Sequence, residues 1–274
     1  MVTVACITYN HGRYLTECLN GIINQVCTFE VEIIVHDDLS TDATRLIIEE
    51  YKDKHPNLIT IFQAENQYSQ GRKPLIDFIL PIAKGKYVAF CEGDDYWTDP
   101  LKLQKQVDFL ERNTEFSFCS HWVNRVSENG EIIKLSELKG KNLLFDKHQI
   151  LHRYFPPVSL VFRNIDIPYS EDLKAVVNGD AVLIGLLSLY GKGAILDFIG
   201  AFYRIHNNGV YSSRTYYKKL KSSVHTRRVM LRANIFDHNA KRELIKEIEM
   251  RKVKAVKESL RRFRFFEAIR MLLI

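Results

Sequence analysis

Paired cysteines are missing from this sequence of 274 residues, and their absence excludes the folds that depend on them. The chain has five cysteines, an odd number, and no two of them have the CxxC spacing. A disulfide-rich secreted domain and a structural zinc site are therefore not expected. Some of the cysteines fall in apolar, strand-like runs and are expected to be buried thiols in a reducing compartment. These are Cys6, Cys91 and Cys119.

A long uninterrupted apolar run is also missing. The longest apolar stretch, residues 181–203, is broken by Lys192, by Asp197 and by four glycines. It therefore predicts a buried helix followed by a strand rather than a membrane span. The first ten residues, MVTVACITYN, have no basic region and no small-residue cleavage site, so no secretory signal is expected there. Both observations favour a cytoplasmic protein.

The sequence has no large excess of charge, but its charge is unevenly distributed. The formal net charge is +6, yet residues 214–274 hold 18 Lys and Arg against 6 Asp and Glu. Residues 1–213 hold 21 basic and 27 acidic residues. We therefore expect a globular domain over 1–213 and a basic helical extension over 214–274. A nucleic-acid partner is not expected, because the larger part is acidic and shows no aromatic-basic motif of an RNA-binding module.

The end of the chain mixes apolar and basic residues at helical spacing. The apolar residues are Phe263, Phe266, Ile269, Leu272 and Leu273, and the basic residues are Arg261, Arg262, Arg264 and Arg270. This pattern predicts a basic amphipathic helix that can lie on an anionic membrane surface, such as the inner face of a cell membrane. The alternative is a helix that packs on the body or on a partner, with its charges in solvent.

Strand-like and helix-like segments alternate in the first half of the chain. Apolar runs typical of strands occupy residues 2–7, 31–36, 58–62, 86–91 and 116–123, and helical patterns separate them. This alternation predicts an α/β fold, with a Rossmann-like, mostly parallel sheet flanked by helices. Asn129-Gly130 predicts a hairpin turn after the fifth strand.

Polar residues follow three of these strands at the point where each strand ends. Asn10 follows the first strand, Asp37 and Asp38 end the second, and residues 92–95 (Glu-Gly-Asp-Asp) follow the fourth. Ligands of open parallel sheets bind at the carboxyl edge, so we expect these sets to collect at one rim. The acidic set is typical of a site for a hard divalent cation such as Mn²⁺ or Mg²⁺. The alternative is an acidic surface turn that caps the next helix.

Further residues near this rim could bind a nucleotide. Asp37 could accept a hydrogen bond from a base or a ribose, Tyr9 could stack on a base, and Arg72 could meet a base or a diphosphate. Each has a structural alternative. The acidic segment after the second strand could cap a helix, Tyr9 could be a core aromatic residue, and the loop of Arg72 could simply be solvated.

The motifs in their order resemble those of the family 2 inverting glycosyltransferases, which have the GT-A fold. The matching segments are Thr8-Tyr9-Asn10, Asp37-Asp38 with Ser40-Thr41-Asp42, Arg72, and EGDDYWTDPLKLQKQ at 92–106. The resemblance covers roughly residues 2–125. Further along it is thinner, with NGDAVL (178–183) similar to the catalytic segment and YRIHNNGVYS (203–212) similar to a late polar loop.

The resemblance implies a role for each matching residue. The nucleotide would be bound by Thr8, Tyr9, Asn10, Asp37, Arg72 and Asp94. Asp95 would ligate Mn²⁺ or Mg²⁺ together with Asp94, which would also face the ribose. His206 could add a ligand to the metal or the diphosphate, although a solvated loop histidine is an equal alternative. Residues 1–125 would form the half that binds the nucleotide sugar and 126–213 the acceptor-side half.

Asp180 would be the catalytic general base, and here the sequence departs from the family pattern. The family usually has Glu before this Asp, whereas this chain has Gly179. Glu171 and Asp172 are nearby carboxylates that keep the choice open. A second departure is Glu92, where an aspartate is more usual.

The function expected from these observations is a metal-dependent inverting glycosyltransferase that uses a nucleotide-sugar donor, with uridine as the first choice of nucleoside. Its acceptor would be a glycan or a lipid-linked acceptor in cell-surface polysaccharide synthesis. One rival is a nucleotidyltransferase that makes sugar nucleotides, but the Gly-rich, basic loop that it needs is poorly matched by TYNHGRYL. The other rival is a non-catalytic module that binds a nucleotide or a glycan. The sequence does not predict an oligomeric state.

Overall fold

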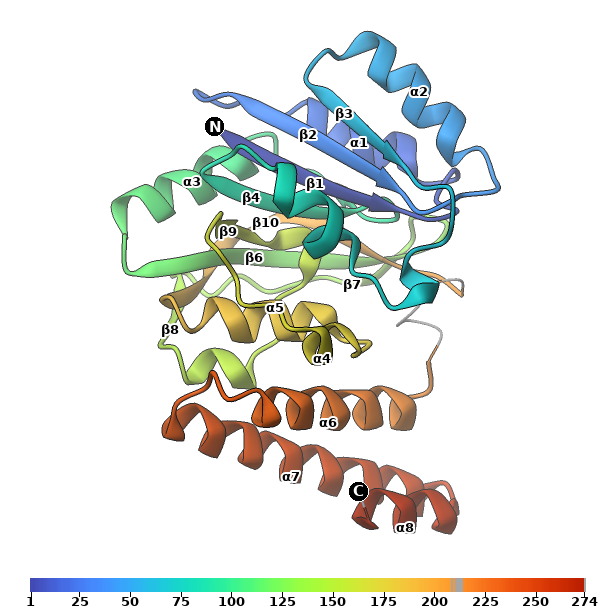
Figure 1. Cartoon of the computed structure of the whole chain (residues 1–274), viewed down its shortest axis with the longest axis vertical. Helices are drawn as coiled ribbons and strands as arrows, with labels where there is room; N and C mark the ends of the chain where they lie inside the picture. Colours follow the sequence, from blue (N-terminus) through green and yellow to red (C-terminus); the bar gives the residue numbers. More distant parts are fainter. Residues whose placement is uncertain (208, 210–213, 274) are drawn as a thin grey trace. The chain divides into compact units, whose positions relative to one another are not determined.

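Strands and helices alternate through the first half of the chain, as the apolar pattern predicts (Figure 1). In the computed structural model, which describes residues 1–207, 209 and 214–273, the elements group into two units. Unit 1 comprises Met1–Leu144, Phe155–Ile167 and Tyr190–Ile205, and unit 2 comprises Phe145–Tyr154, Pro168–Leu189 and His206–Ile274. The domain boundaries expected at residues 125 and 213 stay predictions.

The described strands form one ten-stranded sheet, nearly all of it in unit 1. They are β1 (Val2–Thr8), β2 (Val31–Asp37), β3 (Leu58–Phe62), β4 (Tyr87–Glu92), β5 (Tyr96–Trp97), β6 (Phe116–Ser127), β7 (Ile132–Lys134), β8 (Leu143–Phe145), β9 (Val161–Arg163) and β10 (Lys192–Ile205). The spatial order is β3-β2-β1-β4-β9-β6-β10-β5, with β7 paired to β6 and β8 to β10.

The first four strands are parallel, and the rest of the sheet is mixed. β1 pairs in parallel with β2 and with β4, and β2 pairs in parallel with β3. β9 is antiparallel to both of its neighbours, β4 and β6, while β10 runs parallel to β6. This confirms the predicted α/β class. Gly130, with φ 83°, lies in the predicted turn between the antiparallel strands β6 and β7.

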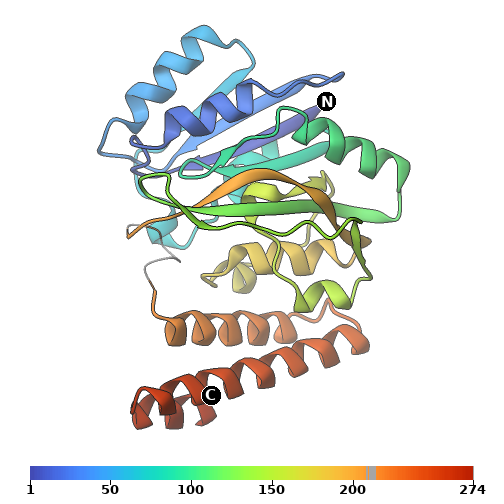
Figure 2. The same ribbon diagram turned by 180° about the vertical axis from the view of Figure 1, so that it is seen from behind.

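Three helices contribute to one core of unit 1. They are α1 (Leu15–Ile23), α2 (Thr44–Lys54) and α3 (Lys102–Arg112). Leu19, Ile48 and Leu103 of these helices share a buried cluster with Val4 of β1, and Figure 2 shows α1 and α3 in front of the sheet. Between β3 and β4, residues Leu75–Ile79 and Leu80–Ile82 form two short helical turns rather than a regular helix, because Pro81 lacks the N–H that a regular helix would use.

The same core contains thiols and a buried amine. All five cysteines are free and four of them are buried, as expected for small core side chains. Lys102 is fully buried, with its Nζ 3.7 Å from the centre of the Trp97 ring. Burial lowers the pKa of Lys102 to about 7, because an ammonium ion loses its hydration there.

Unit 2 is helical. Its helices are α4 (Glu171–Lys174), α5 (Gly179–Leu187), α6 (Tyr216–Arg232), α7 (His238–Arg261) and α8 (Phe265–Leu273). Thr215 and Asp237 cap α6 and α7 by accepting hydrogen bonds from backbone N–H groups of the first turn. α8 folds back against α7 (Figure 1). None of the helices described in the structure has the length and apolarity needed to cross a membrane.

Candidate active site

The ends of β1, β2 and β4 lie side by side, as the carboxyl-edge rule predicts. Thr8, at the end of β1, is in register with Asp37 at the end of β2. On the other side of β1, Ile7 is in register with Glu92, the last residue of β4. The polar sets that follow these strands therefore belong to one rim of unit 1.

The loops after β1 and β2 are held together by side-chain hydrogen bonds. The Asn10 amide oxygen accepts from the N–H of Thr41 at 2.8 Å, and the Ser40 hydroxyl accepts from the N–H of Asn10 at 2.8 Å. Asn10 has a φ of 55°, a left-handed conformation that asparagine tolerates better than most residues. These contacts fix the loop, and they leave the Tyr9 side chain 46% exposed beside it.

Asp37 is buried and accepts several hydrogen bonds from its surroundings. One oxygen accepts from the hydroxyls of Ser40 at 2.5 Å and Thr8 at 3.3 Å, and the other accepts from the Ser40 N–H at 3.2 Å. A carboxylate has about four lone-pair sites, so Asp37 can still accept a further hydrogen bond from a ligand.

Asp38 has a structural task that the sequence did not reveal. Its two oxygens accept from the N–H groups of Gln67 at 2.7 Å and Tyr68 at 3.0 Å, so it anchors the loop that leads to Arg72. The Arg72 Nε lies 3.6 Å from an Asp77 oxygen, and its side chain remains 46% exposed. Arg72 is therefore at the surface of the same part of unit 1, where it can meet an anion.

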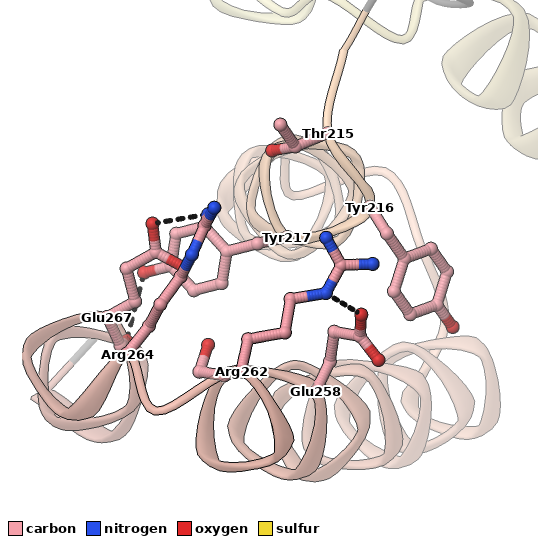
Figure 3. A pocket seen from close by; sticks show the side chains of 8 residues that line it. Thr215, Tyr216, Tyr217, Glu258, Arg262, Arg264 and Glu267 are labelled. Carbon is pink, nitrogen blue, oxygen red and sulfur yellow. Dashed lines mark hydrogen bonds and ion pairs between the residues drawn. The ribbon is translucent and has the colours of Figure 1, made fainter.

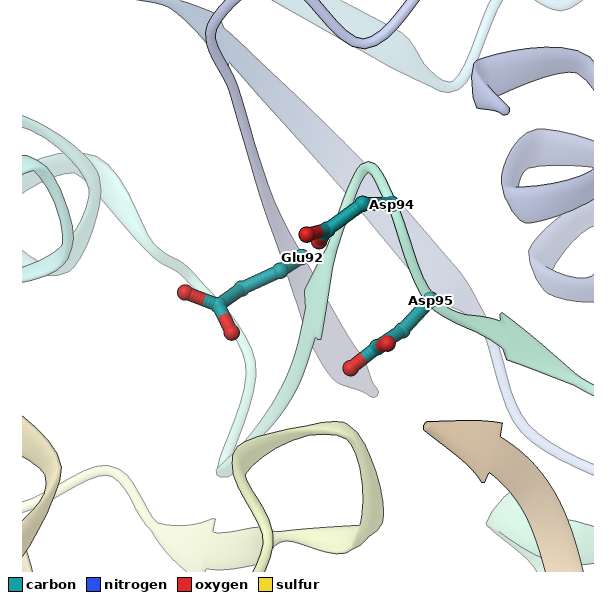
Figure 4. Close-up of side chains that lie close together, drawn as sticks. All are labelled: Glu92, Asp94 and Asp95. Atoms are coloured by element: carbon teal, nitrogen blue, oxygen red, sulfur yellow. The ribbon is translucent and has the colours of Figure 1, made fainter. Parts of the chain in front are cut away.

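Three carboxylates gather on the turn between β4 and β5 (Figure 4). One oxygen from each of Glu92, Asp94 and Asp95 lies within 4.8 Å of the others. Gly93 makes this turn possible, because a Cβ there would lie 2.7 Å from the Thr8 methyl group and 2.9 Å from the His11 Nδ1. His11 also lies near Asp94, with 3.9 Å between Nε2 and the nearer carboxylate oxygen.

Asp95 shows the strongest sign of a cation site. It is 1% exposed, and one of its oxygens accepts from the Arg204 N–H at 2.7 Å. The other oxygen is buried and has no hydrogen-bond partner among the described residues. Burial and the neighbouring charges of Asp94 and Glu92 raise the pKa of Asp95 well above its ordinary range. A hard divalent cation would neutralise this group, so the donor set fits Mn²⁺ or Mg²⁺.

Arg204 of β10 supports the turn that carries Glu92, Asp94 and Asp95, here called the carboxylate turn. The sequence did not predict this role of Arg204. Its guanidinium donates to the Asp94 carbonyl oxygen at 2.9 Å and to a Glu17 carboxylate oxygen at 2.5 Å. Its guanidinium carbon also lies over the rings of Tyr14 and Tyr96, 4.8 and 5.1 Å from their centres. The one feature of the sequence that pointed to Arg204 was its position in residues 203–212, the segment that resembles the late polar loop of the family.

The proposed base, Asp180, lies in the first turn of α5 in unit 2. Burial raises the pKa of its carboxyl group, an effect that Arg227 partly opposes. The alternatives Glu171 and Asp172 are both exposed on α4, and Glu171 pairs with Lys174 at 2.7 Å. Asp180 is therefore the least exposed of the three carboxylates.

His206 is also in unit 2 and is buried, which excludes the solvated-loop alternative. Several residues of the segment that resembles the late polar loop, at 208 and 210–212, lie outside the described residues.

Known sequences resemble this chain over much of its length. The sequence profile described as "Glycosyl transferase family 2" matches residues 3–168. An uncharacterised protein of Mycobacterium tuberculosis is 36% identical over 214 residues, which are 77% of this chain. The chain spans 61% of the length of that relative. An Escherichia coli protein named UDP-Glc:alpha-D-GlcNAc-diphosphoundecaprenol beta-1,3-glucosyltransferase WfaP is 24% identical over 229 residues, 78% of this chain and 81% of WfaP.

Solved structures show the same fold at low sequence identity. S. aureus TarS 1-349 in complex with UDP-GlcNAc has a TM-score of 0.68 at 22% identity, over 92% of this chain and 72% of TarS 1-349. The mannosyltransferase PcManGT of Pyrobaculum calidifontis, in complex with GDP-Man and Mn²⁺, has a TM-score of 0.66 at 17% identity. That match covers 99% of this chain and 74% of PcManGT.

Proposed function

This chain belongs to glycosyl transferase family 2, and from that premise we propose that it transfers a sugar from a nucleotide-sugar donor to an acceptor hydroxyl, with inversion at the anomeric carbon. The observation that carries the proposal is the carboxylate turn of Glu92, Asp94 and Asp95 at the carboxyl edge of the sheet. Burial of an Asp95 oxygen that has no hydrogen-bond partner in the described part of the chain costs free energy unless a cation neutralises it.

The metal in this proposal is Mn²⁺ or Mg²⁺, held by Asp95 and Asp94, with His206 as a further candidate ligand. Bound there, the cation would act as a Lewis acid that stabilises the negative charge of the departing nucleoside diphosphate. Arg204 holds the backbone of the turn, so the two carboxylates are positioned before any ligand arrives. The presence of Mn²⁺ in the PcManGT complex is consistent with this donor set.

The nucleotide would bind along the rim formed by the ends of β1 and β2. Asp37 would accept from the base, the exposed Tyr9 would stack on it, and Arg72 would contact the base or the diphosphate. Thr8 and Asn10 would act mainly through position, because both bond to the neighbouring loop that presents Asp37.

Asp180 would be the general base of the reaction. An acceptor hydroxyl is a weak nucleophile at neutral pH, so a carboxylate must remove its proton as it attacks. Attack on the face opposite the leaving group inverts the configuration. Burial, which raises the pKa of Asp180, makes its carboxylate a stronger base than an exposed aspartate.

The donor and the acceptor are open to direct test. We take a UDP-sugar first, because WfaP is named for UDP-Glc and TarS was solved with UDP-GlcNAc, and a GDP-sugar second, because PcManGT was solved with GDP-Man. The proposed acceptor is a glycan or a lipid-linked acceptor, since the name of WfaP specifies a diphosphoundecaprenol. An enzyme that transfers a sugar to a lipid-linked acceptor would act at the cytoplasmic face of a membrane, in cell-surface polysaccharide synthesis.

Calorimetric titration of UDP and of GDP, with and without Mn²⁺, tests the proposal. Wild type is compared with Asp95→Asn and with Asp53→Asn, which removes an exposed carboxylate on α2 and serves as the control. We expect one nucleotide to bind only with metal, and Asp95→Asn alone to lose that binding. Equal binding without metal and in Asp95→Asn would refute the metal role of Asp95.

Product analysis then separates the rival functions. A glycosyltransferase slowly releases a nucleoside diphosphate from its sugar donor in the absence of acceptor. A nucleotidyltransferase instead releases pyrophosphate from a nucleoside triphosphate and a sugar phosphate, and a pure binding module releases neither.

A further inference from the structure

The outer face of α8 is apolar and uncovered. Large apolar side chains stand on it at helical spacing, each more than half exposed: Phe265 at 56%, Phe266 at 84%, Ile269 at 54%, Leu272 at 65% and Leu273 at 82%. Residues spaced by three, four and seven positions share one side of a helix, so these five form a single stripe, here called the α8 face. An exposed stripe of this kind marks an interaction surface.

The opposite side of α8 is fixed to the rest of unit 2, so the direction of the α8 face is set by packing. Ala268 and Met271 are buried, and Met271 shares a core cluster with residues of α6 and α7. The Tyr217 hydroxyl of α6 donates to the Glu267 carbonyl oxygen at 3.0 Å.

Two ion pairs close the junction of the three helices (Figure 3). Arg264 lies 3.4 Å from Glu267, and Arg262 lies 2.6 Å from Glu258. These contacts all lie on the side of α8 that packs against α6 and α7. The opposite side, the α8 face, is not covered by any described residue.

Most exposed charge in α7 and α8 is positive, although Lys246, Arg262 and Arg264 pair with Glu243, Glu258 and Glu267. Among the exposed charged side chains from 242 to 273, eight are basic and one, Glu249, is acidic. The basic ones are Arg242, Lys246, Lys254, Lys257, Arg261, Arg262, Arg264 and Arg270. α7 also carries exposed apolar side chains, among them Val253 at 51% and Leu260 at 46%, which share one side of that helix because they are seven residues apart. An apolar stripe on a helical unit whose exposed charges are mostly basic is complementary to acyl chains below anionic headgroups.

We propose that the α8 face, with the exposed side of α7, docks the protein on an anionic lipid surface. The apolar stripe enters the headgroup–acyl boundary, and the lysines and arginines meet lipid phosphates. A second copy of this chain fits the surface less well, because a two-fold contact would bring the same basic side chains against each other. The proposal does not depend on the donor chemistry of unit 1.

Flotation with lipid vesicles tests the proposal on the full chain. The vesicles are phosphatidylcholine alone or phosphatidylcholine with phosphatidylglycerol. We expect binding only to the anionic vesicles, and weaker binding at high salt because screening reduces the attraction. Phe266→Ser with Leu273→Ser should weaken binding roughly tenfold or more, since two large apolar contacts are lost.

Two further variants complete the design. Lys254→Ser with Lys257→Ser should weaken binding by about tenfold, because each basic residue near an anionic surface contributes to attraction. Ile132→Ser with Ile133→Ser is the matched control, since these residues are 61% and 52% exposed on β7 and lie outside unit 2. It should bind like wild type. Nucleotide titration on every variant checks that unit 1 is intact.

Other occupants of the face give different results, and each would overturn the proposal. Equal binding of wild type and of Phe266→Ser with Leu273→Ser means that lipid does not contact the stripe. A wild-type dimer in light scattering, converted to a monomer by that apolar double variant, assigns the face to a second copy. Tight binding of RNA or DNA that depends on the lysines but not on the stripe, without binding to vesicles, assigns the basic side chains to a nucleic acid.

Discussion

Replacing Asp95 by asparagine should have opposite consequences with and without metal. Without metal, the wild-type protein holds a buried carboxylate beside two others, and its pKa is raised by burial, Asp94 and Glu92. The asparagine has the same shape and keeps an oxygen for the Arg204 N–H, but it carries no charge. We expect Asp95→Asn to be as stable as wild type in chelator, or more stable.

The pH dependence follows from the direction of this shift. A carboxyl group whose pKa is higher in the folded than in the unfolded protein holds its proton longer when folded. The folded state therefore loses stability as pH rises from the unfolded pKa through the folded one. The advantage of Asp95→Asn in chelator should be present at neutral pH and should shrink as pH falls toward the ordinary aspartate range.

With metal the order should reverse. A ligand at a hundred times its dissociation constant stabilises the folded state by about 2.7 kcal/mol. Each kcal/mol raises the melting temperature by roughly 2–4 °C in a protein of this size class, so Mn²⁺ with nucleotide should raise that of wild type by about 5–10 °C. Asp95→Asn should show almost none of this rise.

Scanning calorimetry with chelator, with Mn²⁺, and with Mn²⁺ plus nucleotide measures both effects. Asp53→Asn, which removes an exposed carboxylate far from the turn in sequence, should behave like wild type throughout. A metal-induced rise in Asp95→Asn equal to that in wild type would refute our reasoning about the buried oxygen. A large loss of stability of Asp95→Asn in chelator would show that its charge is compensated within the folded chain.

Three more changes test other parts of the site. Gly93→Ala should destabilise the protein by about 1–3 kcal/mol in urea denaturation, because its Cβ would meet the Thr8 methyl group at 2.7 Å; an unchanged midpoint would contradict this close packing. Asp38→Ala should cost about 1–3 kcal/mol and speed amide exchange in 66–72, since two N–H groups lose their acceptor; unaltered exchange there would show that other contacts hold the loop. Asp180→Asn should lower kcat about 10²–10⁴-fold with nucleotide affinity unchanged, and wild-type kcat/KM should rise with pH through a pKa above the ordinary aspartate range; full activity in the variant would remove Asp180 as the base.

The parts of the site that are local in sequence could be predicted, because a strand and the turn after it are adjacent in the chain. Glu92, Asp94 and Asp95 needed only an apolar run and the carboxyl-edge rule to be placed together. The hairpin at Asn129-Gly130 and the buried cysteines were likewise predictable from local residue types.

Contacts between distant segments could not be predicted in the same way. Arg204 reaches Asp95 across more than a hundred residues, and that contact depends on the register of β10, which the local apolar pattern leaves undetermined. From the sequence, Asp38 was grouped with Asp37 at the end of the second strand. Its hydrogen-bond partners are instead backbone N–H groups of a later loop. The antiparallel β9 between β4 and β6 is another long-range choice, since a three-residue strand carries almost no periodic signal.

The buried amine of Lys102 should make the fluorescence of Trp97 depend on pH. Its Nζ stands over the Trp97 ring, and Trp97 comes two residues after Asp95. Because burial brings the pKa of this amine to about 7, the charge beside the indole changes near neutral pH, and the fluorescence of Trp97 should change with it. Metal at the carboxylate turn adds positive charge nearby and should move that titration to lower pH. In a Trp122→Phe variant, which leaves Trp97 as the single tryptophan, emission recorded across neutral pH would therefore follow metal binding without any label.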